Sequence, residues 1–81
     1  MGRTLDSRRH EALRAFLVER RKNAGLRQVD LAKRLGRSQS YFTHIETGQK
    51  HVALLELLEW AEAIGFDPEE AIERISNLTS N

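Results

Sequence analysis

The sequence contains no cysteine, a single proline and only five glycines. Without cysteine, the chain has neither a disulfide framework nor a thiolate metal site, which fits a reducing compartment such as the cytoplasm. Its histidines, His10, His44 and His51, show none of the spacings typical of metal ligands. No apolar run approaches the ~20 residues that a membrane-spanning helix needs. We therefore expect no metal, no cofactor and no membrane partner.

The sequence also lacks the strict alternation of apolar and polar residues that predicts β-strands. Its apolar residues recur instead every three or four positions, which is typical of amphipathic helices. With 81 residues, the chain fits one all-α domain over residues 1–81, with residues 1–6 as a flexible arm. Helices are expected over residues 8–24, 28–35, 38–47, 53–64 and 67–78.

Several helix boundaries are marked by capping residues. Ser7 and Ser38 can each accept a hydrogen bond from a free backbone N–H at a helix start. Asp67 precedes the only proline, and Glu70 stands where it can complete a capping box. Arg27 and Ala53 stand at two other helix starts, where neither side chain is a good cap, so we expect weaker ends there.

Charge is distributed unevenly along the chain. Residues 1–50 hold 12 Lys and Arg against 5 Asp and Glu, whereas residues 51–81 hold one Arg against 7 Asp and Glu. A chain this polarised is expected to fold with a basic side and an acidic side. Basic surfaces attract polyanions, of which nucleic acid is the commonest in cells. The alternative is that these charged helix faces are merely solvated.

The expected helix 38–47 has two different faces. Phe42 and Ile45 lie three residues apart and share an apolar face, with Tyr41 beside it. The opposite face has no Lys–Glu pairs of the kind that keep a helix solvated. It carries short or medium polar side chains, namely Gln39, Ser40, Thr43, His44 and Thr47. A short turn with Gly36 separates this helix from the preceding one, which is the pattern of a helix-turn-helix.

The expected helix 53–64 is rich in leucine, and its apolar spacing predicts which residues face the core. The residues expected inward are Leu54, Leu57, Leu58, Ala61 and Ile64. Trp60 is expected at the edge of that stripe, and Leu55 outside it.

The segment LRQVDLAKRLGRSQSYFTHIETGQK resembles the lambda-repressor-like (Cro/repressor, Xre-type) helix-turn-helix family. The matching positions are Gln28, Leu31, Ala32, Leu35, Gly36, Ser38, Phe42, Ile45, Glu46 and Gly48. The resemblance extends over roughly residues 13–75 and implies a compact five-helix DNA-binding domain with the helix-turn-helix at residues 28–47. Arg27, Arg37 and Ala53 depart from the usual family residues, and the first two add positive charge.

The resemblance implies a role for each part of the helix-turn-helix. The second of its helices would lie in the major groove of double-stranded DNA and read bases. The base-reading candidates are Gln39, Ser40, Thr43 and His44. The candidates for DNA-backbone contact are Arg27, Gln28, Arg37, Ser38, Tyr41 and Lys50. Arg21 and Glu46 would form an internal ion pair that fixes the recognition helix.

Relatives of this kind typically bind an inverted-repeat operator as homodimers and repress transcription, often of their own gene. Candidate dimer contacts are Trp60, Phe66, Ile72 and Ile75, each of which can instead close the monomer core. The main alternative function is a protein-interaction module, or an antitoxin-type protein that binds a partner protein. Catalysis is not expected, because Ser40 and His44 have no suitably placed acid and no oxyanion-binding loop.

Overall fold

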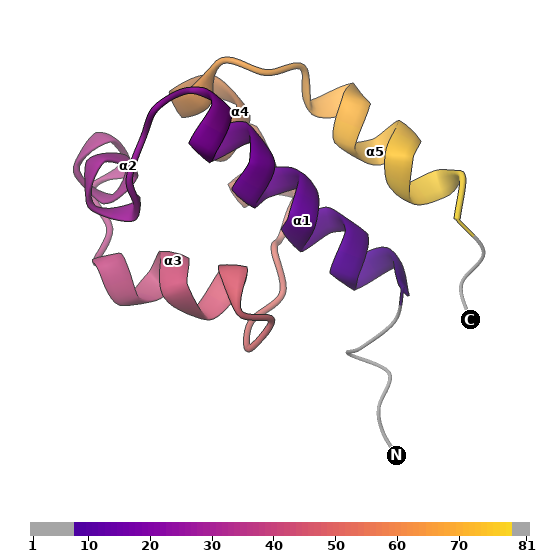
Figure 1. The fold of residues 1–81 in the computed structure, drawn as a ribbon, viewed down its shortest axis with the longest axis horizontal. Helices are drawn as coiled ribbons and strands as arrows, with labels where there is room; N and C mark the ends of the chain where they lie inside the picture. Colours follow the sequence, from indigo (N-terminus) through magenta and orange to yellow (C-terminus); the bar gives the residue numbers. More distant parts are fainter. Residues whose placement is uncertain (1–7, 79–81) are drawn as a thin grey trace.

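The computed structural model describes residues 8–78, which form five α-helices joined by short turns (Figure 1). In chain order they are α1 (Arg8–Asn23), α2 (Gln28–Leu35), α3 (Gln39–Glu46), α4 (Leu54–Ile64) and α5 (Pro68–Ser76). The described range contains no strand. The all-α, five-helix fold expected from the sequence is thus confirmed. The expected arm at residues 1–6 and the Ser7 cap lie outside the described residues.

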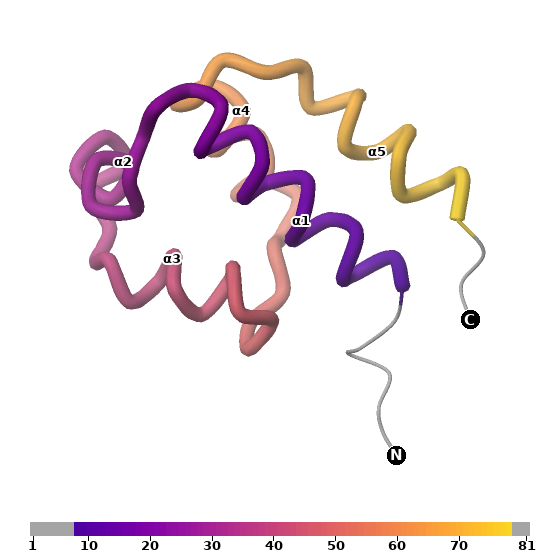
Figure 2. Tube along the Cα trace, viewed as in Figure 1, coloured from indigo at the N-terminus to yellow at the C-terminus, as the bar shows by residue number. Residues whose placement is uncertain are grey.

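Helix α1 is the central element of the fold. It packs against α5 on one side and against α3 and α4 on the others, whereas α2 packs against α3 and α4. The tube in Figure 2 shows α5 running alongside α1, with α2 and α3 following one another on the opposite side of α1. The helix-turn-helix formed by α2 and α3 is therefore supported from within by α1 and α4.

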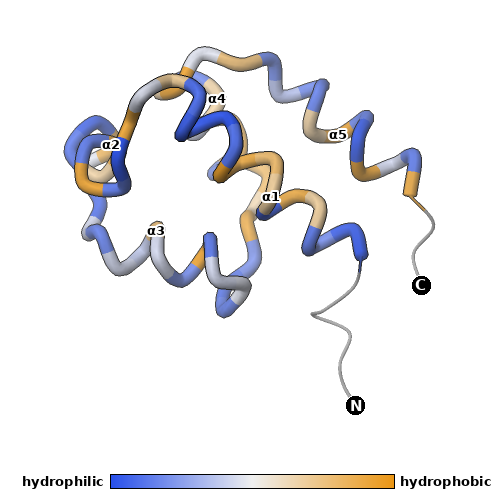
Figure 3. The backbone as a smooth tube through the Cα atoms, in the orientation of Figure 1, coloured by the Kyte–Doolittle hydropathy of each residue, from blue (hydrophilic) through white to orange (hydrophobic). Residues whose placement is uncertain are grey.

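The core is built from large apolar side chains of α1 to α4 and of the turn before α5, and α5 adds Ala71. The largest fully buried side chains are Trp60, Phe16, Phe42, Leu17, Leu31 and Ile45. Phe42 of α3 meets Trp60 of α4 with ring centroids 5.3 Å apart, and Phe16 of α1 meets Phe66 at 5.2 Å. Figure 3 shows hydrophobic positions recurring between hydrophilic ones along α1 and α5. At a spacing of three or four residues, this pattern places the hydrophobic side chains on one face of a helix, which can then be buried.

The prediction for the inward face of α4 was wrong in part. Leu54 and Leu58 are exposed, whereas Trp60, expected at the edge, is completely buried. The helix is turned so that Leu57, Trp60 and Ala61 face the core. A leucine-rich helix offers two overlapping stripes at helical spacing, and burying the larger indole against Phe42 removes more apolar surface from water.

Three helix starts use different groups for capping. Ser38 Oγ accepts from the Tyr41 backbone N–H at 3.4 Å, so the expected cap of α3 is present. At α2, Asp30 Oδ2 accepts from the backbone N–H of Arg27 at 2.8 Å. At α4, Glu56 Oε1 accepts from Ala53 N–H at 2.9 Å. A carboxylate in the first turn thus satisfies one backbone donor at each end that lacks a capping side chain.

The capping box expected at α5 does not form as predicted. Asp67 Oδ1 accepts from Glu69 N–H at 2.9 Å, and Pro68 occupies the first helical position. Glu70, however, pairs with Arg20 of α1 instead of returning to the backbone of Asp67. The long-range guanidinium is a stronger partner for the carboxylate than a single peptide N–H.

Acidic residues of α4 and α5 pair with basic residues from earlier in the chain, in Arg20–Glu70, Arg37–Glu59 at 3.0 Å and Lys50–Glu56 at 3.8 Å. A fourth pair between α5 and α1 has the opposite polarity, Arg74 with Glu19 at 3.3 Å. All lie at partly exposed positions, where one pair contributes only about 0–1 kcal/mol. The acidic half of the sequence is therefore not simply turned away from the basic half, because part of it is matched against that half.

Candidate nucleic-acid interface

The turn between α2 and α3 is set by Gly36 and Ser38. Gly36 has φ of 66°, a left-handed conformation that favours glycine, and its N–H donates to Ala32 O at the end of α2. Two residues later the chain is extended at Ser38, whose side chain caps α3. Because the turn is this short, α3 leaves α2 at a defined angle with its polar face outward.

The outward face of α3 carries the residues expected to read bases. Gln39, Ser40 and His44 are exposed, and Thr43 is partly buried between them and α2. Ser40 Oγ lies 3.1 Å from Ser38 Oγ. The structure therefore places these four side chains together on one surface that combines amide, hydroxyl and imidazole groups.

A buried ion pair joins α1 to the end of α3. Arg21 donates from Nε to Glu46 Oε2 at 2.7 Å and from Nη2 to Glu46 Oε1 at 3.0 Å. Arg21 Nη1 also donates to the Leu26 carbonyl at 2.8 Å. Both charged side chains are under 10% exposed. The pair expected from the resemblance is present, and its two-pronged geometry restricts the position of α3 against α1.

Gln28, the first residue of α2, belongs to the same polar cluster. Its Nε2 donates to Glu46 Oε1 at 2.8 Å, and its Oε1 accepts from Thr43 Oγ1 at 2.8 Å. Both ends of the Gln28 amide are therefore bonded inside the domain, which leaves one side-chain N–H and the backbone N–H for the expected phosphate contact. Sequence reasoning missed this role, since the contact depends on how closely α2 approaches α3.

The basic residues expected to contact the DNA backbone each have a carboxylate partner. Arg27 pairs with Asp30 at 3.1 Å, and the hydrogen bond from Arg27 holds the pKa of Asp30 down at about 2. Arg37 pairs with Glu59, which raises the pKa of the guanidinium, and Lys50 lies near Glu56. These cations surround the polar face of α3, but their charge is partly balanced within the chain.

Tyr41, another candidate for DNA-backbone contact, does not present its hydroxyl on this surface. The hydroxyl oxygen is buried, and burial raises its pKa. The ring packs at right angles to Phe42 with centroids 4.7 Å apart, and the Arg37 guanidinium lies 4.4 Å from its centroid. Tyr41 therefore supports Arg37 by a cation–π contact and has no hydroxyl to offer a phosphate.

Two of the four candidate dimer contacts are in the monomer core. Trp60 and Phe66 are buried, because each packs an aromatic ring against another core ring. Ile75 is partly buried, and Ile72 of α5 is 48% exposed. The other large exposed apolar side chains of the described range are Leu54, Leu55 and Leu58 of α4. Trp60 and Phe66 thus close the monomer core, which is the alternative that the sequence left open for each of them.

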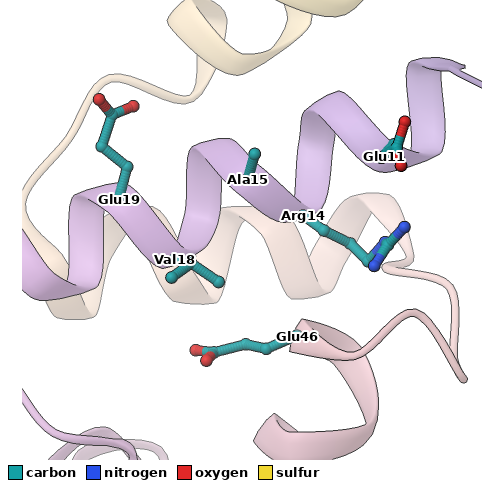
Figure 4. Close-up of a pocket in the computed structure, with 6 residues that line it drawn as sticks. All are labelled: Glu11, Arg14, Ala15, Val18, Glu19 and Glu46. Atoms are coloured by element: carbon teal, nitrogen blue, oxygen red, sulfur yellow. The ribbon is translucent and has the colours of Figure 1, made fainter.

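A shallow groove beside the end of α3 does not gather groups for chemistry. It is lined by Glu11, Arg14, Ala15, Val18, Glu19 and Glu46. In Figure 4, Glu11 and Glu19 point away from Glu46, and Arg14 points toward the turn after α3. There the Arg14 guanidinium lies so close to Gly48 that a Cβ at Gly48 would meet its central carbon at 2.8 Å. Arg14 therefore braces the turn.

The histidines are not arranged as a metal site. His10 and His51 make an edge-to-face ring contact at 4.6 Å, and His44 lies on the outer face of α3. Within residues 8–78, no three His, Cys, Asp or Glu residues are grouped to hold a metal ion. In the same range, no helix combines the length and apolar character needed to span a bilayer.

Comparison with known proteins agrees with this geometry. A family model described as a helix-turn-helix domain matches residues 1–73. The chain belongs to the Xre-type helix-turn-helix family. A solved structure of an XRE-family like protein from Pseudomonas syringae pv. tomato str. DC3000 is 34% identical, with a TM-score of 0.80 over 88% of this chain and 87% of that chain. No curated protein sequence matches the chain.

Membership of the Xre-type family identifies the chain, at a coarse level, as a DNA-binding regulatory protein. This family is regulatory and not typically enzymatic. The helix-turn-helix of the family corresponds here to α2 and α3, the two helices that carry the polar surface and the buried network. The helix-turn-helix that defines the family therefore also carries the expected interface.

Removing one partner of the buried pair should strongly destabilise the domain. We expect Arg21→Met or Glu46→Gln alone to lower the free energy of unfolding by about 3–5 kcal/mol. Arg21→Met leaves the Glu46 carboxylate buried without its cation, and Glu46→Gln leaves the Arg21 guanidinium buried without its anion. The double variant should cost clearly less than the sum of the two. Chemical denaturation measures all four states of this cycle. The exposed pair Arg74–Glu19 is the control, with an expected coupling under about 1 kcal/mol. Additive losses for Arg21 and Glu46 would contradict the coupling.

Proposed function

We propose that this protein is a sequence-specific double-stranded DNA-binding transcriptional regulator. It acts as a homodimeric repressor on an inverted-repeat operator, including that of its own gene, with α3 in the major groove. The observation that carries the proposal is the two-faced α3, whose apolar side and Glu46 are fixed in the domain while Gln39, Ser40 and His44 face outward. A helix held this firmly presents its polar side chains with little loss of conformational entropy on binding.

Within this proposal, Gln39 is the leading base-reading residue. It is the first residue of α3, its side chain is exposed, and a glutamine amide can pair with both N6 and N7 of adenine. Ser40 and His44 lie one helical turn apart on the same face and extend the contact along the groove. Thr43 lies between them. The N-terminal half of a recognition helix is the part that reaches base edges.

Contacts to the DNA backbone would come from the residues around α3. The backbone N–H of Gln28, at the start of α2, suits a phosphate oxygen. Arg27, Arg37 and Lys50 supply positive charge, and Ser38 supplies a hydroxyl at the turn. Such contacts fix orientation and affinity but carry no sequence preference. The protein would work in the bacterial cytoplasm and would be bound to the nucleoid when active. Its gene would belong to the bacterium or to a phage.

A second candidate function is binding of a partner protein, as in an antitoxin. The observation that favours it is the exposure of Leu54, Leu55 and Leu58 on one side of α4. Neighbouring exposed leucines are unusual on a surface that contacts only water. The same side chains can equally meet a second copy of the chain. A protein that bound no duplex DNA but formed a stable complex through α4 would favour this second function.

Binding to DNA should select an inverted repeat and depend steeply on salt. In selection from a random duplex pool, we expect two half-sites about one helical turn apart. Three candidate cations on each of two protomers would contact about six phosphates, so affinity should fall about a thousandfold between about 50 and about 200 mM salt. Fluorescence anisotropy measures this slope on the selected duplex. Affinity that does not change with salt, or a pool with no enriched motif, would refute the proposal.

Base-reading and backbone residues should behave differently when each is truncated. We expect Gln39→Ala to relax preference at one position of each half-site, with a loss of about 1–3 kcal/mol against the best sequence only. Lys50→Ala should instead weaken binding to all sequences alike and make the salt slope less steep by about 1 per protomer. Parallel selections with the two variants and the wild type separate these effects. An unchanged preference profile for Gln39→Ala would remove it from the base-reading set.

Self-association should depend on the exposed apolar residues and not on the buried ones. We expect Ile72→Glu to shift the protein from dimer to monomer in light scattering, because a carboxylate at a half-exposed contact cannot be desolvated cheaply. Leu55→Glu, at a position 72% exposed on α4, is the matched variant on the other apolar site. If only Leu55→Glu dissociates the dimer, the contact between protomers lies on α4 and not on α5. A dimer that survives both substitutions would contradict self-association through these surfaces.

A further inference from the structure

The hydrogen bonds around Gln28 form a chain with a fixed direction. It begins at the Arg21 guanidinium, which can only donate, and passes to the paired Glu46 carboxylate, which accepts. Because Glu46 Oε1 is an acceptor, the Gln28 atom 2.8 Å from it must be the amide nitrogen. The other end of the Gln28 amide is therefore its oxygen. The orientation of the Gln28 amide is therefore set by its hydrogen bond to the buried Glu46 carboxylate.

The direction continues to the surface of α3. Since Gln28 Oε1 accepts, the Thr43 hydroxyl 2.8 Å away must donate its single proton inward. A second acceptor inside the domain, the Gln39 carbonyl at 3.3 Å, lies within reach of the same hydroxyl. The outward side of Thr43 is left with oxygen lone pairs and a methyl group. Free threonine can donate or accept, but here the donor is already used.

We propose that Thr43 is a directional specificity determinant, a role that rests on the DNA-binding function proposed above. With its proton committed to Gln28, its hydroxyl can only accept from a base edge. Adenine N6 and cytosine N4 are the donors in the major groove, whereas guanine presents only the N7 and O6 acceptors there. The base that meets Thr43 on the contacted strand is therefore adenine or cytosine, and guanine is rejected. Gln28 is the positioning residue that imposes this choice.

This arrangement assigns different tasks to neighbouring residues of one helix. Ser40 is exposed, and its hydroxyl bond to Ser38 can run in either direction, so Ser40 can adapt to a donor or an acceptor. Thr47, which follows the last residue of α3, donates to the Thr43 carbonyl at 2.7 Å and not to Gln28. Thr43 alone among these hydroxyls is connected to the buried ion pair. Rejection of a wrong base follows because two acceptors would face each other without a proton between them.

Selection from a random duplex pool tests the proposal with five forms of the full chain. The wild type should deplete guanine by about threefold to tenfold at one half-site position, the worth of one hydrogen bond. Thr43→Ser keeps the hydroxyl and should keep this depletion. Thr43→Val keeps the shape without the hydroxyl and should lose the preference for adenine and cytosine in favour of thymine, whose methyl suits an apolar side chain. Gln28→Leu removes the acceptor at 2.8 Å and leaves only the longer contact to the Gln39 carbonyl at 3.3 Å, so the Thr43 proton can turn toward a base and guanine should be readmitted.

Thr47→Val is the matched control on the same face of α3, and it should leave that position unchanged. Guanine enriched in the wild type would overturn the proposal. So would a profile that Thr43→Val does not alter, or one that Thr43→Val alters and Gln28→Leu does not. Melting curves of all variants establish that the selections compare folded proteins.

A measurement without DNA separates this inference from the proposed function. In the free protein, the Thr43 hydroxyl proton should exchange slowly with water and show an NMR contact to the Gln28 side chain, lost in Gln28→Leu. A rapidly exchanging hydroxyl in the wild type would overturn the fixed direction even if DNA binds. A wild type with the slow hydroxyl that selects no duplex would refute the DNA-binding function, and with it the base preference, while the hydrogen-bond direction stands.

Discussion

The placement of α3 depends on the buried pair between Arg21 and Glu46. Apolar contacts of Phe42 and Ile45 supply most of the energy that holds α3 to the core, but such contacts have little directional preference. A guanidinium fork on a carboxylate is satisfied in only one arrangement, and breaking it inside the domain is costly. The pair therefore fixes the rotation and register of a helix that is only eight residues long. Short helices in water have little stability of their own, so α3 requires such a contact.

The same pair couples the two helices of the helix-turn-helix through Gln28. Because the amide of Gln28 bonds Glu46 at one end and Thr43 at the other, α2 cannot shift against α3 without breaking two hydrogen bonds. Polar networks of this kind are valuable only when every member is satisfied, as each one is here. The turn at Gly36 joins the helices covalently, and the network holds them at one separation. Residues of α2 and α3 that share a surface are in this way held at fixed positions relative to one another.

The helices could be predicted from the sequence because each boundary has a local cause, such as Ser38 as a cap or Gly36 in a left-handed turn. The inward face of α4 could not, since its leucines fit two stripes and only the position of Phe42 decides between them. The pairing of Arg21 with Glu46 was expected only from the family resemblance, because the two residues are far apart in the sequence. The bonds of Gln28 and the burial of the Tyr41 hydroxyl depend on distances between helices, which no local spacing records.

The carboxylate partners of Arg27, Arg37 and Lys50 change what a phosphate contact is worth. A phosphate that approaches these cations replaces Asp30, Glu59 or Glu56 and does not meet a bare charge. The displaced carboxylates are near the surface and regain water, so each exchange costs about 0–1 kcal/mol. That cost applies to every DNA sequence equally, so it lowers specific and non-specific affinity by the same factor. Contacts of α3 to bases are untouched by it, so the preference between sequences is unchanged, and base contacts make up a larger share of a smaller total binding free energy.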